Sequence, residues 1–280
     1  MEIRTSDGVS LHATPYPATP AGGDAVGSVV IVPAMGVPQR FYAPLAQWLA
    51  ARGFATLTFD YRGMGKSRHG SLRDVDIDIV GWAERDVAAA VDAAAGLAPG
   101  RPLTWLGHSL GGQVIAFTPN HTRARRAITI ASGSGYWPEN APALRRRVPL
   151  LWYGVAPLAL PLFGYFPGAR LGMVGDLPHG VMEQWRSWCL HKDYACGVEP
   201  TARGRFAAVK LPINSISFTD DEMMSAANIA SLHCAYASAP QSARRVAPAD
   251  FGVQRIGHFG FFRPELERAW DALLTPHLAR

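Results

Sequence analysis

Cysteine is scarce in this sequence, with three residues in a chain of 280. An odd number without regular spacing excludes a disulfide framework. Cys189, His191 and Cys196 lie close together, but no C-x-x-C pair or second His/Cys cluster completes a metal site. We therefore expect reduced thiols, no bound metal and no cofactor.

Charged residues are also few, at 18% of the chain, and the net charge is only +5. Much of the positive excess lies in short arginine clusters at 123–126, 145–147 and 244–245. Because these clusters are not interleaved with aromatic residues and belong to no nucleic-acid-binding motif, we expect solvated surface and no nucleic-acid partner. The apolar fraction of 48% excludes a disordered chain and predicts a globular protein with a large core.

The first residues, MEIRTSDGVSLHA, lack the apolar stretch of a secretory signal, which favours a cytoplasmic location. Residues 148–166 contain no charge, follow three arginines and are long enough to span a membrane. Pro157 and Pro161 interrupt this run, and interior prolines disfavour one long straight helix. We expect two short apolar helices, no transmembrane span and at most weak contact of this segment with a lipid surface.

Neither of the common phosphate-binding glycine motifs is complete. The stretch GHSLGG does not provide the G-x-G-x-x-G of a dinucleotide site. GMGKS, at 63–67, resembles the end of a P-loop, but Asp60 stands where that motif requires glycine. ATP and dinucleotide binding are therefore not expected.

The remaining pattern alternates between strands and helices. A hairpin at 1–16, with Asp7-Gly8 at its turn, is followed by a loop at 17–27. Strands are then predicted at 28–33, 55–60, 102–107 and 127–133, with helices at 41–53, at 78–96 and from Ser109. This alternation predicts a parallel sheet covered by helices on both faces.

After residue 135 the alternation stops. Residues 136–207 are rich in Trp, Pro and Leu and show no clear strand. The alternation then returns with a strand at 212–218, a helix near 223–237, a strand within 243–256 and a helix from 264. We expect an α/β core formed by 1–135 and 208–280, with 136–207 inserted as a helical cap.

The sequence LTWLGHSLGGQV, at 103–114, matches a G-x-S-x-G nucleophile elbow between a strand and a helix. The tight turn leaves little room for side chains two residues before and after the serine, and Gly107 and Gly111 occupy those positions. A glycine-rich strand-to-helix loop is the structural alternative. In the elbow interpretation, Ser109 is the nucleophile and its neighbour His108 points away from the site.

A serine hydroxyl needs a base to take its proton and a carboxylate to orient that base. His258, in VQRIGHFGFF, is predicted to lie between the last strand and the last helix, at the same sheet edge as Ser109. Asp220, Asp221 and Glu222 follow the preceding strand, although an exposed polar turn would also explain them. The oxyanion would be bound by the Leu110 N–H and by an N–H of the loop at 34–36.

Together these residues resemble the α/β-hydrolase superfamily, whose members have the order Ser, Asp, His along the chain. LTFDYRGMGKS resembles the D-x-R-G-x-G-x-S stretch found in many members. Loosely, the chain is similar to the monoacylglycerol lipase and serine-aminopeptidase-like branch. The resemblance covers most of the chain outside 136–207, and it implies a mostly parallel central sheet with a helical cap inserted after strand six.

The resemblance also refines two assignments. Members place the acid at the start of a D-x-x-x-P turn, and Asp221 fits that register with Ser225 in place of proline, so Asp221 is preferred over Asp220. Where members have His-Gly before the second oxyanion donor, this chain has Pro33-Ala34 followed by Met35. Met35 N–H is then the expected donor, on a backbone with less freedom than glycine would give.

We therefore expect a serine hydrolase that cleaves a lipophilic or aromatic small-molecule carboxylic ester through an acyl-enzyme. The aromatic residues expected to give the cap a substrate-selecting surface are Trp137, Trp152, Tyr153, Phe163, Phe166, Trp185 and Trp188. An acyltransferase using the same triad and a non-catalytic binder of small ligands remain alternatives. Amide, thioester and C–C bond cleavage also remain open, since a fold does not determine its function.

Overall fold

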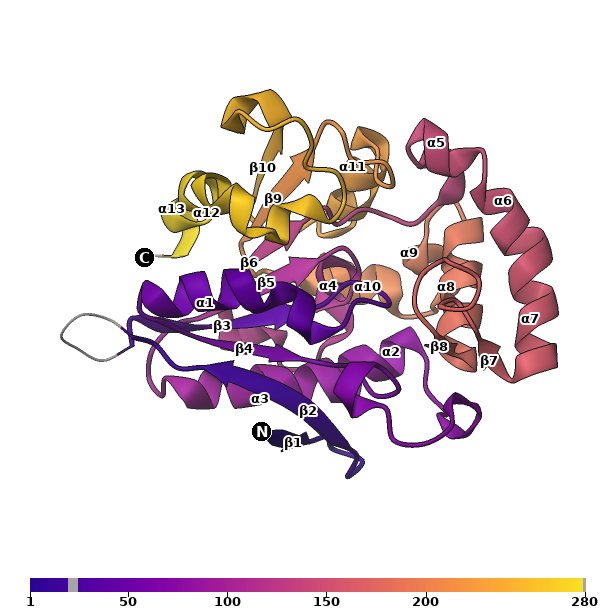
Figure 1. Ribbon diagram of the computed structural model, residues 1–280, viewed down its shortest axis with the longest axis horizontal. Helices are drawn as coiled ribbons and strands as arrows, with labels where there is room; N and C mark the ends of the chain where they lie inside the picture. Colours follow the sequence, from indigo (N-terminus) through magenta and orange to yellow (C-terminus); the bar gives the residue numbers. More distant parts are fainter. Residues whose placement is uncertain (20–24, 279–280) are drawn as a thin grey trace.

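The computed structural model describes residues 1–19 and 25–278, so part of the loop predicted at 17–27 lies outside the described residues. Within them, eight strands form one sheet in the order β1-β2-β4-β3-β5-β6-β9-β10 (Figure 1). The strands are β1 (Glu2–Arg4), β2 (Ser10–Tyr16), β3 (Gly27–Val32), β4 (Phe54–Phe59), β5 (Leu103–His108), β6 (Ala124–Ile130), β9 (Ile213–Phe218) and β10 (Gln241–Val246). Strands β1 and β2 are antiparallel and the rest are parallel, which confirms the predicted fold class.

Helices cover both faces of this sheet. In the core they are α1 (Ala43–Ala51), α2 (Ile79–Gly81), α3 (Ala88–Leu97), α4 (Leu110–Gln113), α11 (Ala226–Ala235), α12 (Glu267–Leu273) and α13 (Thr275–Leu278). The predicted helix at 78–96 contains a π-helical turn at Trp82–Val87, between α2 and α3. The helix expected from Ser109 is only four residues long, because two of those residues are glycines, which favour the helix poorly.

The buried strands divide their side chains between two apolar cores. Val29 and Ile31 of β3 pack into the core that contains residues of α1 and α12, whereas Val30 and Val32 pack into the core that contains residues of α3. Alternate residues of a strand point to opposite faces, so a continuous run of β-branched residues fits a strand buried on both sides. Figure 1 shows α1 and α3 on opposite sides of the sheet.

Between β6 and β9 the chain leaves the sheet and forms a helical region near one end of the strands (Figure 1). Its elements are α5 (Pro142–Arg145), α6 (Val148–Leu150), α7 (Ala156–Phe163), α8 (His179–Leu190), α9 (Ala195–Val198) and α10 (Ala202–Ala208), with the short strands β7 (Tyr165–Phe166) and β8 (Leu177–Pro178). Strands β7 and β8 are not predictable from the sequence, because a two-residue strand is too short for a periodic pattern.

The apolar run at 148–166 differs from its prediction of two short helices. A π-helical turn at 151–155 joins α6 to α7, so 148–163 is one continuous helical segment. The π turn changes the hydrogen-bond spacing just before Pro157, whose missing N–H would otherwise interrupt the helix. One side of the segment is open to solvent, with Leu158 and Leu162 each 72% exposed. No helix in the described part of the chain has the length and apolarity needed to cross a membrane.

Candidate active site

Ser109 follows β5 directly and has a strained backbone conformation. Its φ of 50° lies in a region that residues other than glycine rarely adopt, and α4 begins at the next residue. The Ser109 amide donates to the Ile130 carbonyl of β6 at 2.9 Å, which ties the turn to the sheet. The strand, turn and helix of a nucleophile elbow are therefore present, at the edge where the parallel strands end.

Two glycines make this turn sterically feasible. A Cβ atom at Gly107 would lie 2.4 Å from the Gly111 carbonyl oxygen, and one at Gly111 would lie 2.1 Å from the Val32 carbonyl oxygen. Both separations are far shorter than a van der Waals contact and involve backbone atoms, which cannot rotate away. The spacing of these glycines around Ser109 is therefore a packing requirement of the turn.

The loop between β10 and α12 carries His258, whose side chain is buried against Asp221. His258 Nδ1 lies 2.9 Å from Asp221 Oδ2 and 3.2 Å from Oδ1. Asp221 Oδ1 also accepts the backbone N–H groups of Met223 and Met224, both at 2.8 Å. These donors hold the carboxylate in one orientation, and the carboxylate in turn fixes the plane of the imidazole.

The two other acidic residues of the cluster bind the backbone of residues 256–258 rather than the His258 ring. Asp220 Oδ2 accepts the N–H groups of Ile256 at 2.8 Å and Gly257 at 3.0 Å. Glu222 Oε2 accepts the N–H of His258 at 3.1 Å. Of the two aspartates left open by the sequence, the structure brings Asp221 to the imidazole.

Ser109 and His258 line one cavity of about 340 Å³, and Met35 and Leu110 line the same cavity. In residues 1–19 and 25–278, the backbone N–H groups of Met35 and Leu110 donate to no acceptor. Two unpaired N–H groups beside a serine hydroxyl are the arrangement that an oxyanion hole requires. Ser109 Oγ and the His258 ring share the cavity without a hydrogen bond between them among the described residues. Such contacts are often long in unliganded enzymes.

The loop that carries Met35 lies directly under a loop of the helical region. Gly36 has a φ of +72°, and a Cβ atom there would lie 2.4 Å from Val174 Cγ2 and 2.9 Å from Gly175 N. Met173, Val174 and Gly175 also line the Ser109 cavity. The segment at 173–175 therefore contacts both the cavity and the expected oxyanion loop.

His108 is buried away from the cavity, as the elbow interpretation predicted, and it links two parts of the site. Its Nδ1 lies 2.9 Å from Tyr42 Oη, and its Nε2 lies 3.0 Å from the His258 carbonyl oxygen. Tyr42 Oη in turn accepts the N–H of Ala34 at 2.9 Å. Burial holds the pKa of His108 well below its ordinary value, so the ring is neutral. Nε2–H then donates to His258, and Nδ1 accepts from Tyr42.

Residues of LTFDYRGMGKS hold the expected oxyanion loop from the other side. The Tyr61 hydroxyl donates to the Pro33 carbonyl oxygen at 3.1 Å. Asp60 Oδ1 accepts the backbone N–H of Gln39 at 2.8 Å, and Asp60 Oδ2 accepts its side-chain amide at 2.9 Å. The resemblance of this segment to a stretch in many α/β hydrolases indicated its importance from the sequence. No motif indicated that Tyr42, Tyr61 and Gln39 lie near the site.

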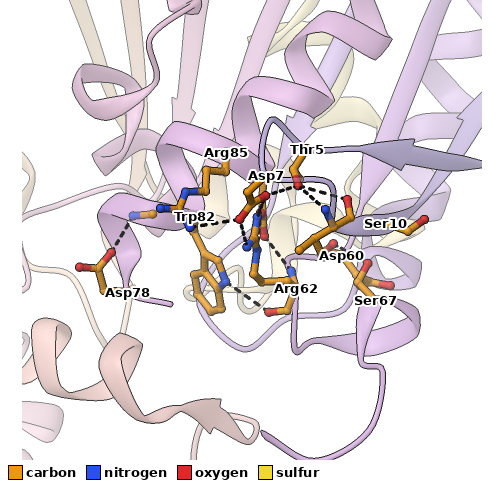
Figure 2. A network of polar contacts seen from close by, with 12 residues as sticks. Thr5, Asp7, Ser10, Asp60, Arg62, Ser67, Asp78, Trp82 and Arg85 are labelled. Atoms are coloured by element: carbon orange, nitrogen blue, oxygen red, sulfur yellow. Dashed lines mark hydrogen bonds and ion pairs between the residues drawn. The ribbon is translucent and has the colours of Figure 1, made fainter. Parts of the chain in front are cut away.

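Arg62, in the same segment, is the centre of a buried ionic network. It contacts Asp7 of the N-terminal turn and Asp86 of the π-helical turn at 2.6 Å each, and Arg85 contacts Asp7 at 3.1 Å. Figure 2 shows Asp7 between Arg62 and Arg85, with the Trp82 indole donating to the Arg62 carbonyl. Arg62 holds the pKa of Asp7 well below its ordinary value, whereas burial raises the pKa of Asp86 to about 6.

The aromatic residues expected to face the substrate lie in different environments. Trp185 lines the Ser109 cavity. Trp188 and Phe166 are buried in the apolar core that also contains residues of α3, whereas Tyr153 is 61% exposed to solvent. Among residues 1–19 and 25–278, no group of three or more His, Cys, Asp or Glu side chains is arranged to hold a metal ion.

The fold of the chain is similar to that of several solved structures. The chain is similar to a soluble variant of monoglyceride lipase from Saccharomyces cerevisiae in complex with a substrate analog, with a TM-score of 0.68 and 18% identity over 96% of this chain and 92% of that one. It is also similar to an esterase from Exiguobacterium antarcticum, with a TM-score of 0.60 and 15% identity over 99% and 98% of the chains. Est816, an N-acyl homoserine lactone degrading enzyme, gives a TM-score of 0.63 and 17% identity over 99% and 100%.

Identities this low support the shared fold alone. No curated protein matches the sequence of the chain. The model of the family described as serine aminopeptidase, S33, matches residues 23–166, which is more than half of the chain. The protein therefore belongs to the serine aminopeptidase S33 family of α/β hydrolases.

Proposed function

We propose that the protein hydrolyses a carboxylic ester through an acyl-enzyme formed on Ser109. The observation that carries this proposal is the meeting of four groups at one cavity. They are the Ser109 side chain on its strained turn, the His258 ring held by Asp221, and the unpaired N–H groups of Met35 and Leu110. These groups come from three separate segments of the chain, since Ser109 and Leu110 are neighbours on one turn, and each has the chemistry that its position requires.

In the proposed reaction, His258 Nε2 takes the Ser109 proton as Oγ attacks the ester carbonyl carbon. The Met35 and Leu110 N–H groups stabilise the negative charge that develops on the carbonyl oxygen. The imidazolium returns its proton to the leaving alcohol, which departs as the acyl-enzyme forms. Water then attacks the acyl group with His258 again as the base, which releases the acid and restores Ser109.

The cavity favours a neutral ester over the peptide that the family name suggests. An aminopeptidase must bind the free ammonium group of its substrate, and burying an unpaired charge is very costly. None of the described residues that line the Ser109 cavity is an aspartate or glutamate, and most are apolar. An aminopeptidase is therefore the second candidate.

We also propose that residues 136–207 act as a cap that selects an apolar substrate group. Met173, Val174, Gly175 and Trp185 of this segment line the Ser109 cavity. Burial of apolar surface contributes about 0.8 kcal/mol per CH₂ group. The kcat/KM for 4-nitrophenyl esters should therefore rise from acetate toward longer acyl chains until the cavity is filled. Equal turnover of all chain lengths would contradict selection by the cap.

Labelling with a fluorophosphonate probe tests the proposed nucleophile. The wild-type protein should be labelled and should hydrolyse 4-nitrophenyl butanoate, whereas folded Ser109→Ala should do neither. Folded wild-type protein that resists the probe would favour a non-catalytic binder. Product analysis with added alcohols or thiols separates an acyltransferase from a hydrolase, and aminoacyl-4-nitroanilides test the aminopeptidase.

A further inference from the structure

The turn at 34–37 carries the Met35 N–H, which is one of the two proposed oxyanion donors. The Val37 N–H donates to the Ala34 carbonyl oxygen at 3.2 Å, and Gly36 has a φ of +72°. These features are typical of a type II turn. The peptide group between Ala34 and Met35 is planar and trans, so its N–H points away from the carbonyl that Val37 holds. The direction of the Met35 N–H therefore depends on how firmly this peptide group is held.

The preceding peptide group, between Pro33 and Ala34, is held at both ends by buried tyrosines. The Tyr61 hydroxyl donates to the Pro33 carbonyl oxygen at 3.1 Å, and the Ala34 N–H donates to Tyr42 Oη at 2.9 Å. Because the carbonyl and the N–H of a trans peptide group point in opposite directions, the two hydroxyls hold it from opposite sides. The plane of this peptide group is therefore fixed just before the turn begins.

Both tyrosine side chains are themselves fixed. Tyr42 Oη lies 2.9 Å from Nδ1 of the neutral His108, whose Nε2–H donates to a backbone carbonyl. Nδ1 therefore accepts the hydrogen of the Tyr42 hydroxyl, which leaves the oxygen lone pairs for the Ala34 N–H. The Tyr61 ring stacks on Trp82 with ring centres 4.6 Å apart. Neither hydroxyl can move away without leaving a buried polar group unpaired, which is costly.

We propose that Tyr42 and Tyr61 are positioning residues for the oxyanion donor Met35. Neither tyrosine lines the Ser109 cavity, so neither hydroxyl acts on the substrate directly. Both act through the peptide group at 33–34, which sets the direction of the Met35 N–H relative to the developing oxyanion. This proposal rests on the proposed function, because it concerns the transition state of that reaction.

Tyr42 also connects the loop of the oxyanion donor to the loop of the base. Its partner His108 donates to the His258 carbonyl oxygen at 3.0 Å. A continuous series of hydrogen bonds therefore runs from the Ala34 N–H through Tyr42 and His108 to the backbone of His258. Tyr61 holds the donor loop alone. Loss of the Tyr42 hydroxyl should therefore disturb the site more than loss of the Tyr61 hydroxyl.

Phenylalanine variants remove each hydroxyl and keep the ring. In Tyr42→Phe, kcat for 4-nitrophenyl butanoate should fall about 10- to 100-fold, less than the roughly 100- to 1,000-fold that removal of an oxyanion donor costs. KM should stay within about threefold, because the lost alignment matters in the transition state and not in substrate binding. Tyr61→Phe should show the same division with a smaller loss in kcat, about 3- to 10-fold.

An alkyl trifluoromethyl ketone reports on the oxyanion contact directly. Ser109 Oγ bonds to the ketone carbon, the Ser109 proton passes to His258, and the ketone oxygen becomes the oxyanion. Because this adduct resembles the transition state, its inhibition constant should rise in Tyr42→Phe by the factor by which kcat/KM falls. Loss of packing alone would not link these two quantities.

Thr129 and His233 provide a matched control. Thr129 Oγ1 lies 2.9 Å from Nε2 of His233, whose Nδ1 lies 2.7 Å from a backbone carbonyl oxygen. Burial lowers the pKa of His233, as it does for His108, and neither Thr129 nor His233 lines the Ser109 cavity. Thr129→Val therefore removes a buried hydroxyl from a buried histidine, as Tyr42→Phe does. It should lower the thermal unfolding temperature comparably and leave kcat and the inhibition constant within about threefold of the wild-type values.

The proposal is overturned if folded Tyr42→Phe keeps wild-type kcat, if its loss lies in KM alone, or if Thr129→Val loses as much kcat. If Tyr42→Phe does not fold, Tyr61→Phe decides, and wild-type kcat in that folded variant overturns the proposal. Ester hydrolysis by the wild-type protein in any of these cases leaves the proposed function intact. If the wild-type protein hydrolyses no ester and resists the fluorophosphonate probe, the proposed function itself fails, and the positioning roles fail with it.

Discussion

Replacing Asp221 with asparagine should nearly abolish ester hydrolysis, because it reverses the hydrogen bonding of His258. The Asp221 carboxylate accepts both from His258 Nδ1 and from the N–H groups of Met223 and Met224. An asparagine would keep its oxygen toward the two backbone donors and turn its NH₂ group toward Nδ1. Nδ1 must then accept, so the ring proton moves to Nε2, which can no longer take the proton of Ser109. The expected loss in kcat is about 10⁴-fold.

Asp220→Asn is the matched control, one residue away in the same acidic cluster. Asp220 Oδ2 accepts from Ile256 at 2.8 Å and Gly257 at 3.0 Å, while its Oδ1 has no partner among the described residues. Asparagine can keep its oxygen on those two donors. Exchanging a charged acceptor for a neutral one should cost about 1 kcal/mol of folding stability. Because the His258 ring is not touched, kcat should stay within about threefold, less than the tenfold change that ~1.4 kcal/mol of barrier would give.

Steady-state hydrolysis of 4-nitrophenyl butanoate by the two variants, with thermal unfolding of each, provides the measurement. The reasoning is refuted if folded Asp220→Asn loses as much activity as Asp221→Asn. It is also refuted if folded Asp221→Asn keeps about a tenth or more of wild-type kcat, since a ring in the wrong tautomer cannot act as the base.

Three further predictions concern the turn, the ionic network and the apolar helix. Gly111→Ala should reduce the yield of folded protein, because the alanine Cβ would lie 2.1 Å from the Val32 carbonyl oxygen. A variant that unfolds at the same urea concentration as the wild-type protein would contradict this prediction. Arg62 lowers the pKa of Asp7, so this pair stabilises the fold above the ordinary pKa of 3.8 and loses that contribution as the pH falls further. Asp7→Asn should therefore flatten the acid limb of the stability curve measured by thermal unfolding, and an unchanged limb would exclude the pair as a contributor. Leu158 is 72% exposed on the apolar helical segment that follows the arginines at 145–147 in the chain, and it should contact anionic vesicles. Leu158→Glu should therefore reduce co-sedimentation with such vesicles, and equal co-sedimentation would count against lipid contact.

The sequence was most informative where short-range sterics dictate the residue. The glycines around Ser109 predicted the turn because a larger residue at Gly107 would meet the backbone of Gly111, and one at Gly111 would meet the backbone of Val32 in β3. The loop with His258 was found from its place between a strand and a helix. The cytoplasmic location, the cap boundary and the catalytic roles of these residues stay predictions.

Sequence patterns could not resolve features that depend on side-chain direction or on distant contacts. Asp220 and Asp221 are adjacent, and only the folded loop decides which of them meets His258. Tyr42 reaches His108 across 66 positions of the chain, and no periodicity encodes such a contact. The π-helical turn at 151–155 has no sequence signature, because Pro157 alone does not show whether a helix breaks there or changes its hydrogen-bond spacing.

The tight contact of Gly36 with Val174 and Gly175 has a consequence for how substrate reaches the serine. An outward movement of the segment at 173–175 would widen the Ser109 cavity and would also remove the contact that this segment makes with the loop of Met35. Such a movement would loosen the position of the Met35 N–H, and its reversal would restore that position. Access to the Ser109 cavity and support of the Met35 loop would therefore change together, because one short segment contributes to both.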